Sequence, residues 1–259
     1  MKTKINSMPI SLLLLTHNSS FDLTKHFGWL KDCQAIDEIV VVDDNSTDNT
    51  KKIVDGFQTK NRQVKFFSRG LDNDFSSQRN FAVSKTKNDW VLWLDPDEQP
   101  EEKLIRFLGS IDTSQYNYSF QRPLVYFNHT LTHGESFNVY ITRLFNKNYG
   151  QFVGLVHETW QSSKPVVQKD LTIYHYSIPN LKAFLEKINF YSTLRAQELF
   201  DQKVKTNLFQ IIFYPKAKFI QNYIFRLGFL DSTPGIIIAL CMSFHSFLVR
   251  SKLWHLSQK

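Results

Sequence analysis

Residues 37–50 read DEIVVVDDNSTDNT, a continuous aliphatic run that stops on two adjacent aspartates. Isoleucine and valine favour extended backbone, and a run without polar alternation is typical of a strand buried on both faces in a parallel sheet. Ser46, Thr47 and Asp48 follow, and such residues commonly begin a helix. The stretch therefore predicts a buried parallel strand that ends in carboxylates and leads into a helix over 45–57.

The same alternation of strand and helix extends over the first 115 residues. Further aliphatic runs predict strands at 9–18, 64–69 and 89–98, and amphipathic spacing predicts helices over 21–33 and 74–87. Strands that alternate with helices at this spacing build βαβ units. We therefore predict an α/β fold with a mostly parallel, twisted sheet flanked by helices.

Two further regions follow along the chain. From about residue 116 the pattern changes to shorter, aromatic-rich strands, in 116–127, 137–145 and 171–177. From Asn180 onward, apolar residues recur at helical spacing, as in Leu181, Phe184, Leu185, Ile188, Tyr191 and Leu194. Helices are also predicted over 207–228 and 233–255, with Pro215 and Pro234 as breakers or first-turn residues.

The positive charge is concentrated in the last region. Residues 180–259 hold 11 Lys and Arg against 4 Asp and Glu, whereas residues 1–179 hold 20 of each sign. A basic, Phe-rich region favours an anionic membrane surface or an anionic substrate. A solvated face, a helical subdomain packed on the core or a dimer interface explains the same pattern, and these alternatives stay open.

Sequence features bearing on membrane and compartment point to the cytoplasm. The apolar stretch 234–249 is broken by His245 and falls short of the ~20 residues that a spanning helix needs, so we expect no transmembrane helix. The N-terminal run ISLLLL is shorter than a signal-peptide core and favours a first strand. Cys33 and Cys241 are far apart and lack metal-ligand spacing, which favours a reducing compartment.

Acidic side chains end a neighbouring predicted strand as well. In LDPDE, Asp95 and Asp97 are two residues apart, which in extended backbone places both carboxylates on one face. Hard carboxylate oxygens suit Mg²⁺ or Mn²⁺, which usually retain phosphates and waters as further ligands. An acidic turn that starts the next helix is the alternative. Because ligands bind beyond the carboxyl ends of parallel strands, these ends predict a ligand site.

Several motifs, taken in order, carry a resemblance to a known family. They are LLLLTHN (12–18), EIVVVDDNSTDNT (38–50), SSQRNFAVSKTKNDWVLWLDPDE (76–98), RLF (143–145), GLVHETW (154–160), IYHYS (173–177), KINFYSTLRAQEL (187–199) and NYIFRLGFLDSTPGIIIAL (222–240). The chain resembles family 2 glycosyltransferases of the GT-A fold, and more narrowly the bacterial lipopolysaccharide-core beta-1,4-glucosyltransferase branch.

The resemblance implies a domain division. A GT-A catalytic domain would span 1–179, with a nucleotide-sugar half over about 1–115 and an acceptor half over about 116–179. A basic amphipathic helical region would follow over 180–259.

The resemblance also implies roles for matching residues in donor binding. Thr16 and Asn18 would line the nucleotide pocket, and Asp43 or Asp44 would hydrogen-bond the uracil ring or the ribose, with helix capping as their alternative. Arg79 would approach the base or phosphates, or else be a solvated helix residue. Asp95 would contact the ribose and the metal region, and Asp97 would hold a Mg²⁺ or Mn²⁺ ion that bridges the diphosphate. The family often has Ala where this chain has Pro96.

A second set of residues would act on the acceptor side. Glu158 is the candidate catalytic base or acceptor-positioning residue, and His157 would assist the metal or diphosphate. A structural role on an aromatic strand is the alternative for this pair. Glu135 and Asp89 are weaker candidates for the base. His175 and Tyr176 lie where the family brings a loop near the diphosphate.

The expected function is transfer of a hexose, glucose in the favoured case, from a UDP-sugar to a lipid-linked lipopolysaccharide or lipooligosaccharide core. Transfer would depend on a metal and invert the anomeric centre by single displacement. The chain would be peripheral on the anionic inner face of the cell membrane, without nucleic-acid partners and with a possible homodimer through its C-terminal helices. The alternatives are an inactive sugar-nucleotide-binding scaffold and a phosphoacceptor signalling module.

Overall fold

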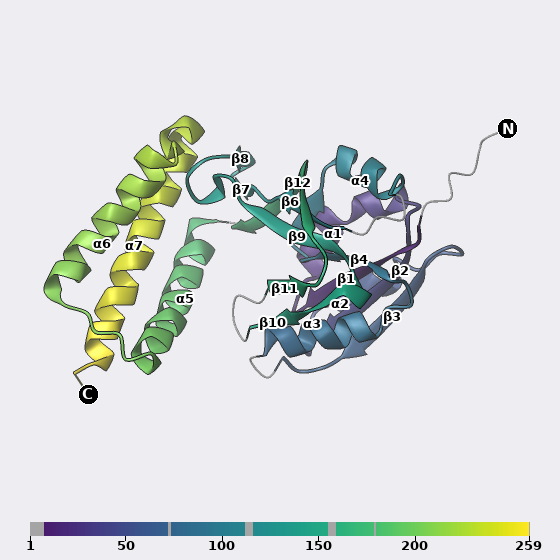
Figure 1. Ribbon diagram of the computed structural model, residues 1–259, viewed down its shortest axis with the longest axis horizontal. Coiled ribbons are helices and arrows are strands. Elements are labelled where there is room, and N and C mark those ends of the chain that lie inside the picture. Colours follow the sequence, from purple (N-terminus) through teal and green to yellow (C-terminus); the bar gives the residue numbers. More distant parts are fainter. Residues whose placement is uncertain (1–7, 72–73, 112–115, 155–158, 179, 259) are drawn as a thin grey trace. The chain divides into compact units, whose positions relative to one another are not determined.

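The structure is a computed structural model that describes residues 8–71, 74–111, 116–154, 159–178 and 180–258 (Figure 1). The chain divides into two compact units, which are described separately. The first unit comprises Met1–Arg122 and Tyr140–Tyr174, and the second comprises Pro123–Val139 and His175–Lys259.

A mixed sheet forms the first unit. Its strands lie in the order β3 (Gln63–Ser68), β2 (Ile36–Asp43), β1 (Ile10–Thr16), β4 (Trp90–Leu94), β9 (Tyr140–Asn146), β6 (Asn117–Gln121) and β12 (Val166–Ile178). The first four are parallel, β9 is antiparallel to both neighbours, and β12 is parallel to β6. The short strand β5 (Glu98–Pro100) pairs with β12, and β10 (Gly150–Val153) pairs with β11 (Thr159–Ser162). The predicted mostly parallel arrangement is confirmed.

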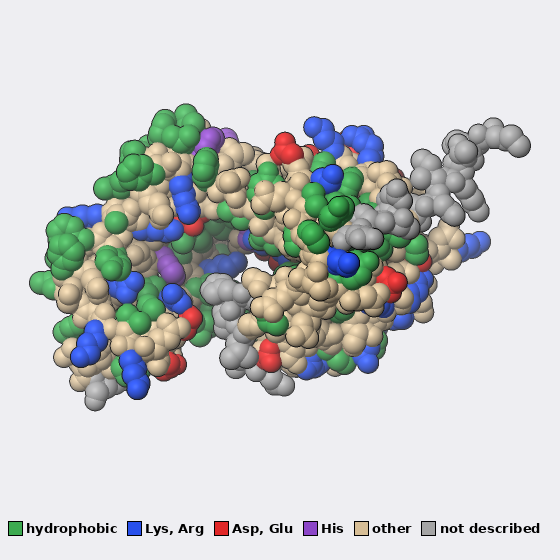
Figure 2. Space-filling view, in the orientation of Figure 1, with side chains coloured by type: hydrophobic (Ala, Val, Ile, Leu, Met, Phe, Trp, Pro, Cys, Tyr) green, Lys and Arg blue, Asp and Glu red, His purple; other side chains and the backbone are tan. Residues whose placement is uncertain are grey.

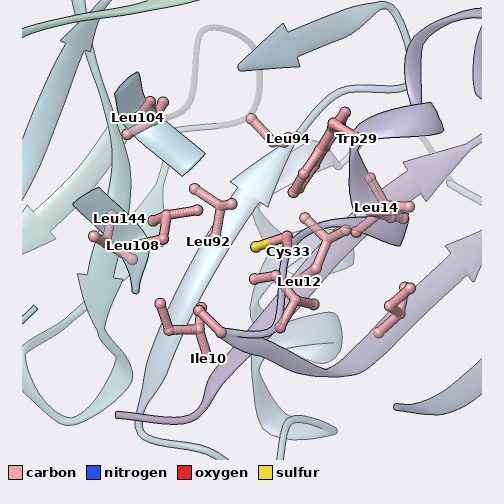
Figure 3. Close-up of a cluster of buried hydrophobic side chains, with 14 of the residues drawn as sticks. Ile10, Leu12, Leu14, Trp29, Cys33, Leu92, Leu94, Leu104, Leu108 and Leu144 are labelled. Atoms are coloured by element: carbon pink, nitrogen blue, oxygen red, sulfur yellow. The ribbon is translucent and has the colours of Figure 1, made fainter. Parts of the chain in front are cut away.

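Helices cover both faces of this sheet, which explains the continuous aliphatic strands. Leu12 packs in a cluster with residues of α1 (Ser20–His26), the short helix η1 (Gly28–Lys31), α2 (Thr50–Asp55) and α4 (Glu102–Leu108). Figure 3 shows Leu12, Leu14, Leu92 and Leu94 in this cluster with Trp29, Cys33, Leu104 and Leu108.

The alternating residues of the same strands pack on the opposite face. Leu13, Val42 and Val91 lie in a second cluster with Ala82 of α3 (Phe75–Ser84) and with Phe152 and Trp160 of β10 and β11. Nearly every side chain of β1, β2 and β4 is therefore buried, because one set faces each helical layer.

Helix α2 is shorter than the sequence predicts. It begins at Thr50 and not at Asn45, because residues 44–49 form a loop whose polar groups bond to the loop after β1. The remaining predicted helices of this unit are present, with the 21–33 helix divided into α1 and η1.

The second unit holds the C-terminal helices. The helices are α5 (Leu181–Asp201), α6 (Leu208–Ile220) and α7 (Ser232–Leu256), with a π-helical turn η4 (Gln221–Phe225) and a short helix η5 (Gly228–Asp231) between the last two. In Figure 1, α7 lies between α5 and α6. Pro215 lies inside α6, and Pro234 lies in the first turn of α7.

A segment from the middle of the chain belongs to this second unit. Pro123–Val139 forms β7 (Leu124–Tyr126), β8 (His129–Leu131) and η2 (Gly134–Ser136). Glu135 pairs with Lys218 Nζ at 2.8 Å, and His133 Nδ1 lies 2.9 Å from Asp231 Oδ1. These contacts hold the segment to the helices, so the second unit includes residues before 180, and the domain boundary expected at 179/180 stays a prediction.

The premise that the late apolar stretch is too short to span a membrane is wrong, whereas the absence of a transmembrane helix stays a prediction. Gly228–Leu256 is a helical stretch of 29 residues with mean hydropathy 1.6 over its most apolar window, enough to cross a membrane by length and composition. The helix continues through His245 and extends to Leu256. The apolar run 234–249 therefore underestimates the length of the helix.

Candidate functional site

The carboxyl ends of β1 and β2 meet at one edge of the sheet. Thr16 and Asp43 are register partners, and Thr16 Oγ1 donates a hydrogen bond to Asp43 Oδ1 at 2.6 Å. Asp43 is 3% exposed, and it also accepts bonds from the Ser46 amide at 2.8 Å and the Ser46 hydroxyl at 2.6 Å. The carboxylate is therefore held in one orientation at the strand end.

The loops after these two strands are bonded to each other. Asn18 adopts a left-handed conformation with φ 48° and accepts a bond from the Thr47 amide at 2.9 Å. Asp48 accepts bonds from the Ser20 amide at 3.0 Å and the Thr50 amide at 2.9 Å. Burial raises the Asp48 pKa, but these hydrogen bonds outweigh it and leave the pKa well below its usual range. The loops thus form one preorganised rim.

Asp44 lies on this rim with its side chain partly exposed. Its Oδ1 accepts a bond from the Leu71 amide at 3.1 Å, and its Oδ2 lies 3.8 Å from His17 Nδ1. With an exposed fraction of 31%, the carboxylate is accessible to a ligand. Asp43 and Asp44 therefore differ. The carboxylate of Asp43 is buried and held by hydrogen bonds, whereas that of Asp44 is partly exposed to solvent.

Asp95 and Asp97 are arranged differently from the prediction. The Glu98 amide donates to the Asp95 carbonyl at 3.0 Å, and Pro96 and Asp97 form the turn between them. The backbone is therefore a tight turn and not an extended strand, so the premise of two carboxylates on one strand face is wrong. Both residues are partly exposed and remain at the carboxyl end of β4.

Behind this turn lies a buried network of charges. Glu98 is fully buried and accepts from Arg122 Nε and, at 2.5 Å, from Arg143 Nη2. Arg143 Nη2 also donates to Asp95 Oδ2 at 2.8 Å. Burial lowers the pKa of Arg143, but the neighbouring carboxylates of Glu98 and Asp95 outweigh this effect and raise the pKa. The positive charge of Arg143 is therefore stabilised.

Trp93 contacts two guanidinium groups. Arg79 Cζ lies 3.7 Å and Arg143 Cζ lies 3.8 Å from the ring centroid, and two groups this close occupy opposite faces of the ring. Arg79 is only 7% exposed, so it is not a solvated helix residue. Burial lowers its pKa to about 9, although nearby Asp95 acts in the opposite direction. A second buried cation therefore lies behind the strand ends.

The residues that would hold a metal fit hard oxygen coordination. Among the described residues, no group of three or more His, Cys, Asp or Glu side chains is arranged around a common point. Asp97 and Asp95 offer carboxylate oxygens on one turn, and Arg143 already engages one oxygen of Asp95. Such a pair fits an ion whose remaining ligands come from substrate phosphates and water.

The acceptor-side residues of the prediction are only partly described. His157 and Glu158 lie outside the described residues. His175 belongs to the second unit, where its amide donates to the Pro123 carbonyl at 3.0 Å. Glu135 is engaged by Lys218 and Asn222 in that same unit. Asp89 is exposed at the amino end of β4, the opposite end from Asp95, which weakens it as a base.

Sequence reasoning missed three members of the buried network. Glu98 closes the quoted motif LDPDE, and Arg143 opens the quoted motif RLF. Arg122 precedes Pro123 in an aromatic strand with no comparable signal. The available indications were Glu98, an acid beside the two candidate ligands Asp95 and Asp97, and Arg143, a cation in a predicted aromatic-rich strand.

Comparison with known proteins identifies the family of the chain. The model of Glycosyl transferase family 2 matches residues 28–164, more than half of the chain. An uncharacterized glycosyltransferase of Rickettsia bellii is 28% identical over 269 residues, covering 96% of this chain and 87% of the relative. The lipopolysaccharide core biosynthesis glycosyltransferase LpsC of Rhizobium meliloti is 24% identical over 260 residues, covering 96% and 93%.

Solved structures of similar arrangement include that of S. aureus TarS 1-349 in complex with UDP-GlcNAc. It is 16% identical, covers 97% of this chain and 92% of its own, and gives a TM-score of 0.48.

The family match and the observed sheet together confirm the predicted fold class, a GT-A type mostly parallel sheet flanked by helices with a C-terminal helical extension. The predicted enzyme class is confirmed as well. The chain is a glycosyltransferase and belongs to glycosyl transferase family 2.

Proposed function

We propose that the chain transfers a hexose, glucose in the favoured case, from a UDP-sugar to a lipopolysaccharide or lipooligosaccharide core acceptor. The observation that carries the proposal is a set of carboxylates at one edge of the sheet. Asp43 and Asp44 lie at the end of β2, and Asp95 and Asp97 follow β4, the two parallel strands that flank β1. Strands in a sheet are ~4.8 Å apart, so the two groups of acids are about 10 Å apart, a span suited to a nucleoside diphosphate.

The nucleoside would occupy the β1–β2 side of this edge. Asp44, with its partly exposed carboxylate, is the acceptor for a uracil N–H or a ribose hydroxyl, and Asp43 fixes the surrounding backbone through Thr16 and Ser46. The rim loop containing Asn18 and Asp48 needs no rearrangement to receive the base, because its bonds are already formed.

The diphosphate would lie toward the turn after β4. Asp97 and Asp95 would hold a Mg²⁺ or Mn²⁺ ion, which supplies charge neutralisation for the departing diphosphate when it is bound. Arg143 fixes the Asp95 carboxylate, and Glu98 fixes Arg143. This rigid support keeps the turn in one geometry during the reaction.

Transfer itself is proposed as a single displacement that inverts the anomeric centre. The acceptor hydroxyl oxygen forms a bond to the anomeric carbon while the bond from that carbon to the diphosphate oxygen breaks. The electron pair of the broken bond leaves with UDP, and the hydroxyl proton passes to a carboxylate. Glu158 is proposed for that base because it falls in the VHE motif on which the resemblance rests.

A lipid-linked core acceptor is supported by the relative named for lipopolysaccharide core biosynthesis. Such an acceptor is made at a membrane, so we place the protein in the cytoplasm, peripheral on the inner face of the cell membrane. The basic excess of residues 180–259 supports this location, because cations favour an anionic leaflet.

The test is UDP release with a panel of UDP-sugars, Mn²⁺ and a core oligosaccharide acceptor. We expect release with UDP-glucose, and a decrease of about a hundredfold or more in Asp97→Ala, since the group proposed to hold the ion is lost. Asp89→Ala is the matched control, because it removes an aspartate from the other end of β4, and it should retain full activity.

Two outcomes would overturn the proposal. If wild-type protein releases UDP no faster than Asp97→Ala while still binding UDP, the inactive-scaffold alternative holds. If another donor is consumed faster than UDP-glucose, the sugar assignment fails and the enzyme class stands. Product mass and the anomeric proton coupling then decide acceptor and stereochemistry.

A further inference from the structure

Helix α6 presents an apolar surface that the second unit leaves uncovered. None of its 13 residues is buried, although the helix is strongly apolar. Exposed fractions reach 70% for Leu208, 62% for Phe209 and 75% for Phe225 in the following turn. We define the α6 face as the exposed Leu, Ile and Phe residues of α6 and η4, namely Leu208, Phe209, Ile212, Phe213, Ile220, Ile224 and Phe225.

The α6 face is continuous and ordered by helix geometry. Phe209, Ile212 and Phe213 recur three and four residues apart, which places them on one side of the helix. The rings of Phe209 and Phe213 stack with centroids 4.2 Å apart. Apolar patches of this kind on a protein surface mark interaction sites with a partner or a membrane.

Basic side chains surround these apolar residues. Lys216 Nζ lies 5.2 Å over the Phe213 ring, and Arg250 Cζ lies 4.5 Å over the Tyr214 ring. Lys205 is exposed just before the helix, and Arg226 follows η4. Figure 2 shows hydrophobic side chains along α6, at the left edge of the view, with Lys and Arg among them. Long cationic side chains next to apolar ones extend to a charged interface while their stems stay in an apolar layer.

The packing of the three helices favours insertion in the membrane plane and disfavours a helix that spans the membrane. Helix α7 is apolar enough to span, but it packs against α5, whose Phe184 and Ile188 share a cluster with Ile238 and Cys241. Near the C-terminal end of α7, Lys252 Nζ donates to the Asn189 carbonyl of α5 at 2.7 Å.

Helix α5 is poorly suited to a hydrocarbon environment. It carries exposed charged residues along its length, including Glu186, Lys187, Arg195 and Glu198. A spanning α7 would draw these charges into the bilayer, which is strongly unfavourable. Helix α6 from Leu208 to Tyr214 carries no charge, so it inserts without this penalty.

We propose that α6 and η4 form an in-plane membrane anchor that binds an anionic lipid surface. The α6 face enters the boundary between headgroups and acyl chains, and Lys205, Lys216 and Arg226 contact the lipid phosphates. Helix α7 stays outside the hydrocarbon core. This inference deepens the membrane location given under the proposed function, but it depends on no catalytic residue and is tested without substrate.

The test is flotation of the full-length protein with vesicles of phosphatidylethanolamine and phosphatidylglycerol. Wild type should float with these vesicles. The triple variant F209S/F213S/F225S should bind at least tenfold more weakly, because three inserting rings are lost. The matched control is F190S/L194S, which removes two exposed apolar side chains from α5 and should float like wild type.

The contribution of the basic residues and the arrangement of the protein in the membrane are tested by separate measurements. K205E/K216E should weaken binding by about fivefold or more per lysine and abolish the preference over phosphatidylcholine vesicles. Cell membranes washed with alkaline carbonate should release wild-type protein. Circular dichroism and UDP binding confirm that each variant is folded, independently of vesicle binding.

Three results would overturn the proposal. Equal flotation of wild type and the triple variant would show that α6 is not the anchor. Retention in the carbonate-washed membrane would show a spanning helix. A dimer in sedimentation that dissociates in the triple variant, without any vesicle binding, would show that the α6 face binds a second copy. Failure of the glycosyltransferase assay would leave all three measurements unaffected.

Discussion

At the scale of single residues, Glu98 holds the arginines that position the candidate ligand Asp95. It is fully buried and bridges Arg122 and Arg143, and Arg143 in turn holds Asp95. Buried ion pairs add little net stability when complete, but removal of one partner leaves an uncompensated charge. The residue that matters most for the geometry of Asp95 is therefore one that no ligand is proposed to touch.

We predict that Glu98→Gln lowers the free energy of unfolding by about 3 kcal/mol, because the buried guanidinium group of Arg143 and the partly buried one of Arg122 lose their shared anion. UDP release should fall in parallel as Asp95 loses its fixed partner. Urea denaturation measures the first effect. Glu102→Gln, which removes an exposed pair with Arg106, is the control and should change stability by less than about 0.5 kcal/mol.

Sequence reasoning reached the acids of this site but not their arrangement. The carboxylates at the ends of β2 and β4 could be predicted, because a polar residue directly after an aliphatic run can be recognised in the sequence alone. The turn at Pro96 and Asp97 reverses the direction of Glu98 toward Arg122 and Arg143, which are distant in sequence. Such a pairing depends on strand order, and no local pattern encodes it.

At the scale of elements, the loops after β1 and β2 act as one structure. Asp48 links them by accepting amide bonds from Ser20 and Thr50. Composition predicted a helix start at Ser46 to Asp48, but these residues bond to the loop after β1 and cap no helix. Helix α2 begins later for that reason.

We predict that Asp48→Asn makes the protein less sensitive to acid. Hydrogen bonds outweigh burial and lower the Asp48 pKa in the folded state, so its contribution to stability is present above the unfolded pKa, near 4. That contribution is lost as pH falls through the folded pKa. The variant should be less stable than wild type at pH 7, and the difference should shrink as pH falls below about 4. Thermal unfolding across pH checks this, and a constant difference would contradict it.

A close helix approach in the second unit gives another prediction. A Cβ on Gly235 would lie 2.0 Å from the Gly228 carbonyl oxygen, so α7 and η5 meet backbone to backbone. Gly235→Ala should lower the free energy of unfolding by about 2 kcal/mol through forced separation. Gly28→Ala, where a Cβ meets nothing within 4 Å, is the control. Equal unfolding midpoints for the two variants would contradict the expectation.

At the scale of the whole molecule, the chain is two units of different chemistry. The first is a sheet with its acidic edge, and the second is a basic helical layer with an uncovered apolar helix. Composition alone predicted the change at Asn180, because charge and periodicity shift there. Composition did not predict that Pro123–Val139 belongs with the helices, because its sequence is typical of aromatic-rich strands. The residues that it contacts, Lys218 and Asp231, are also distant in sequence.

We predict that UDP with Mn²⁺ alters the two units unequally. Amide hydrogen exchange should slow in the loops at 17–20, 44–49 and 95–98, where ligand binding removes local opening. Exchange in α5 and α7 should be unchanged, since no proposed donor contact lies there. Mass spectrometry of peptides measures both regions, and the Asp97→Ala variant serves as the control with reduced protection.

The discontinuous second unit has a consequence for synthesis. Pro123–Val139 leaves the ribosome long before Lys218 and Asp231, its partners in α6 and η5. At ~5–20 residues per second, the segment waits on the order of ten seconds for them. All strands of the sheet have emerged once Ile178, the last residue of β12, has left the ribosome. Helices α6 and α7 are therefore made last, so all strands of the sheet have emerged before the apolar surface of α6 is exposed.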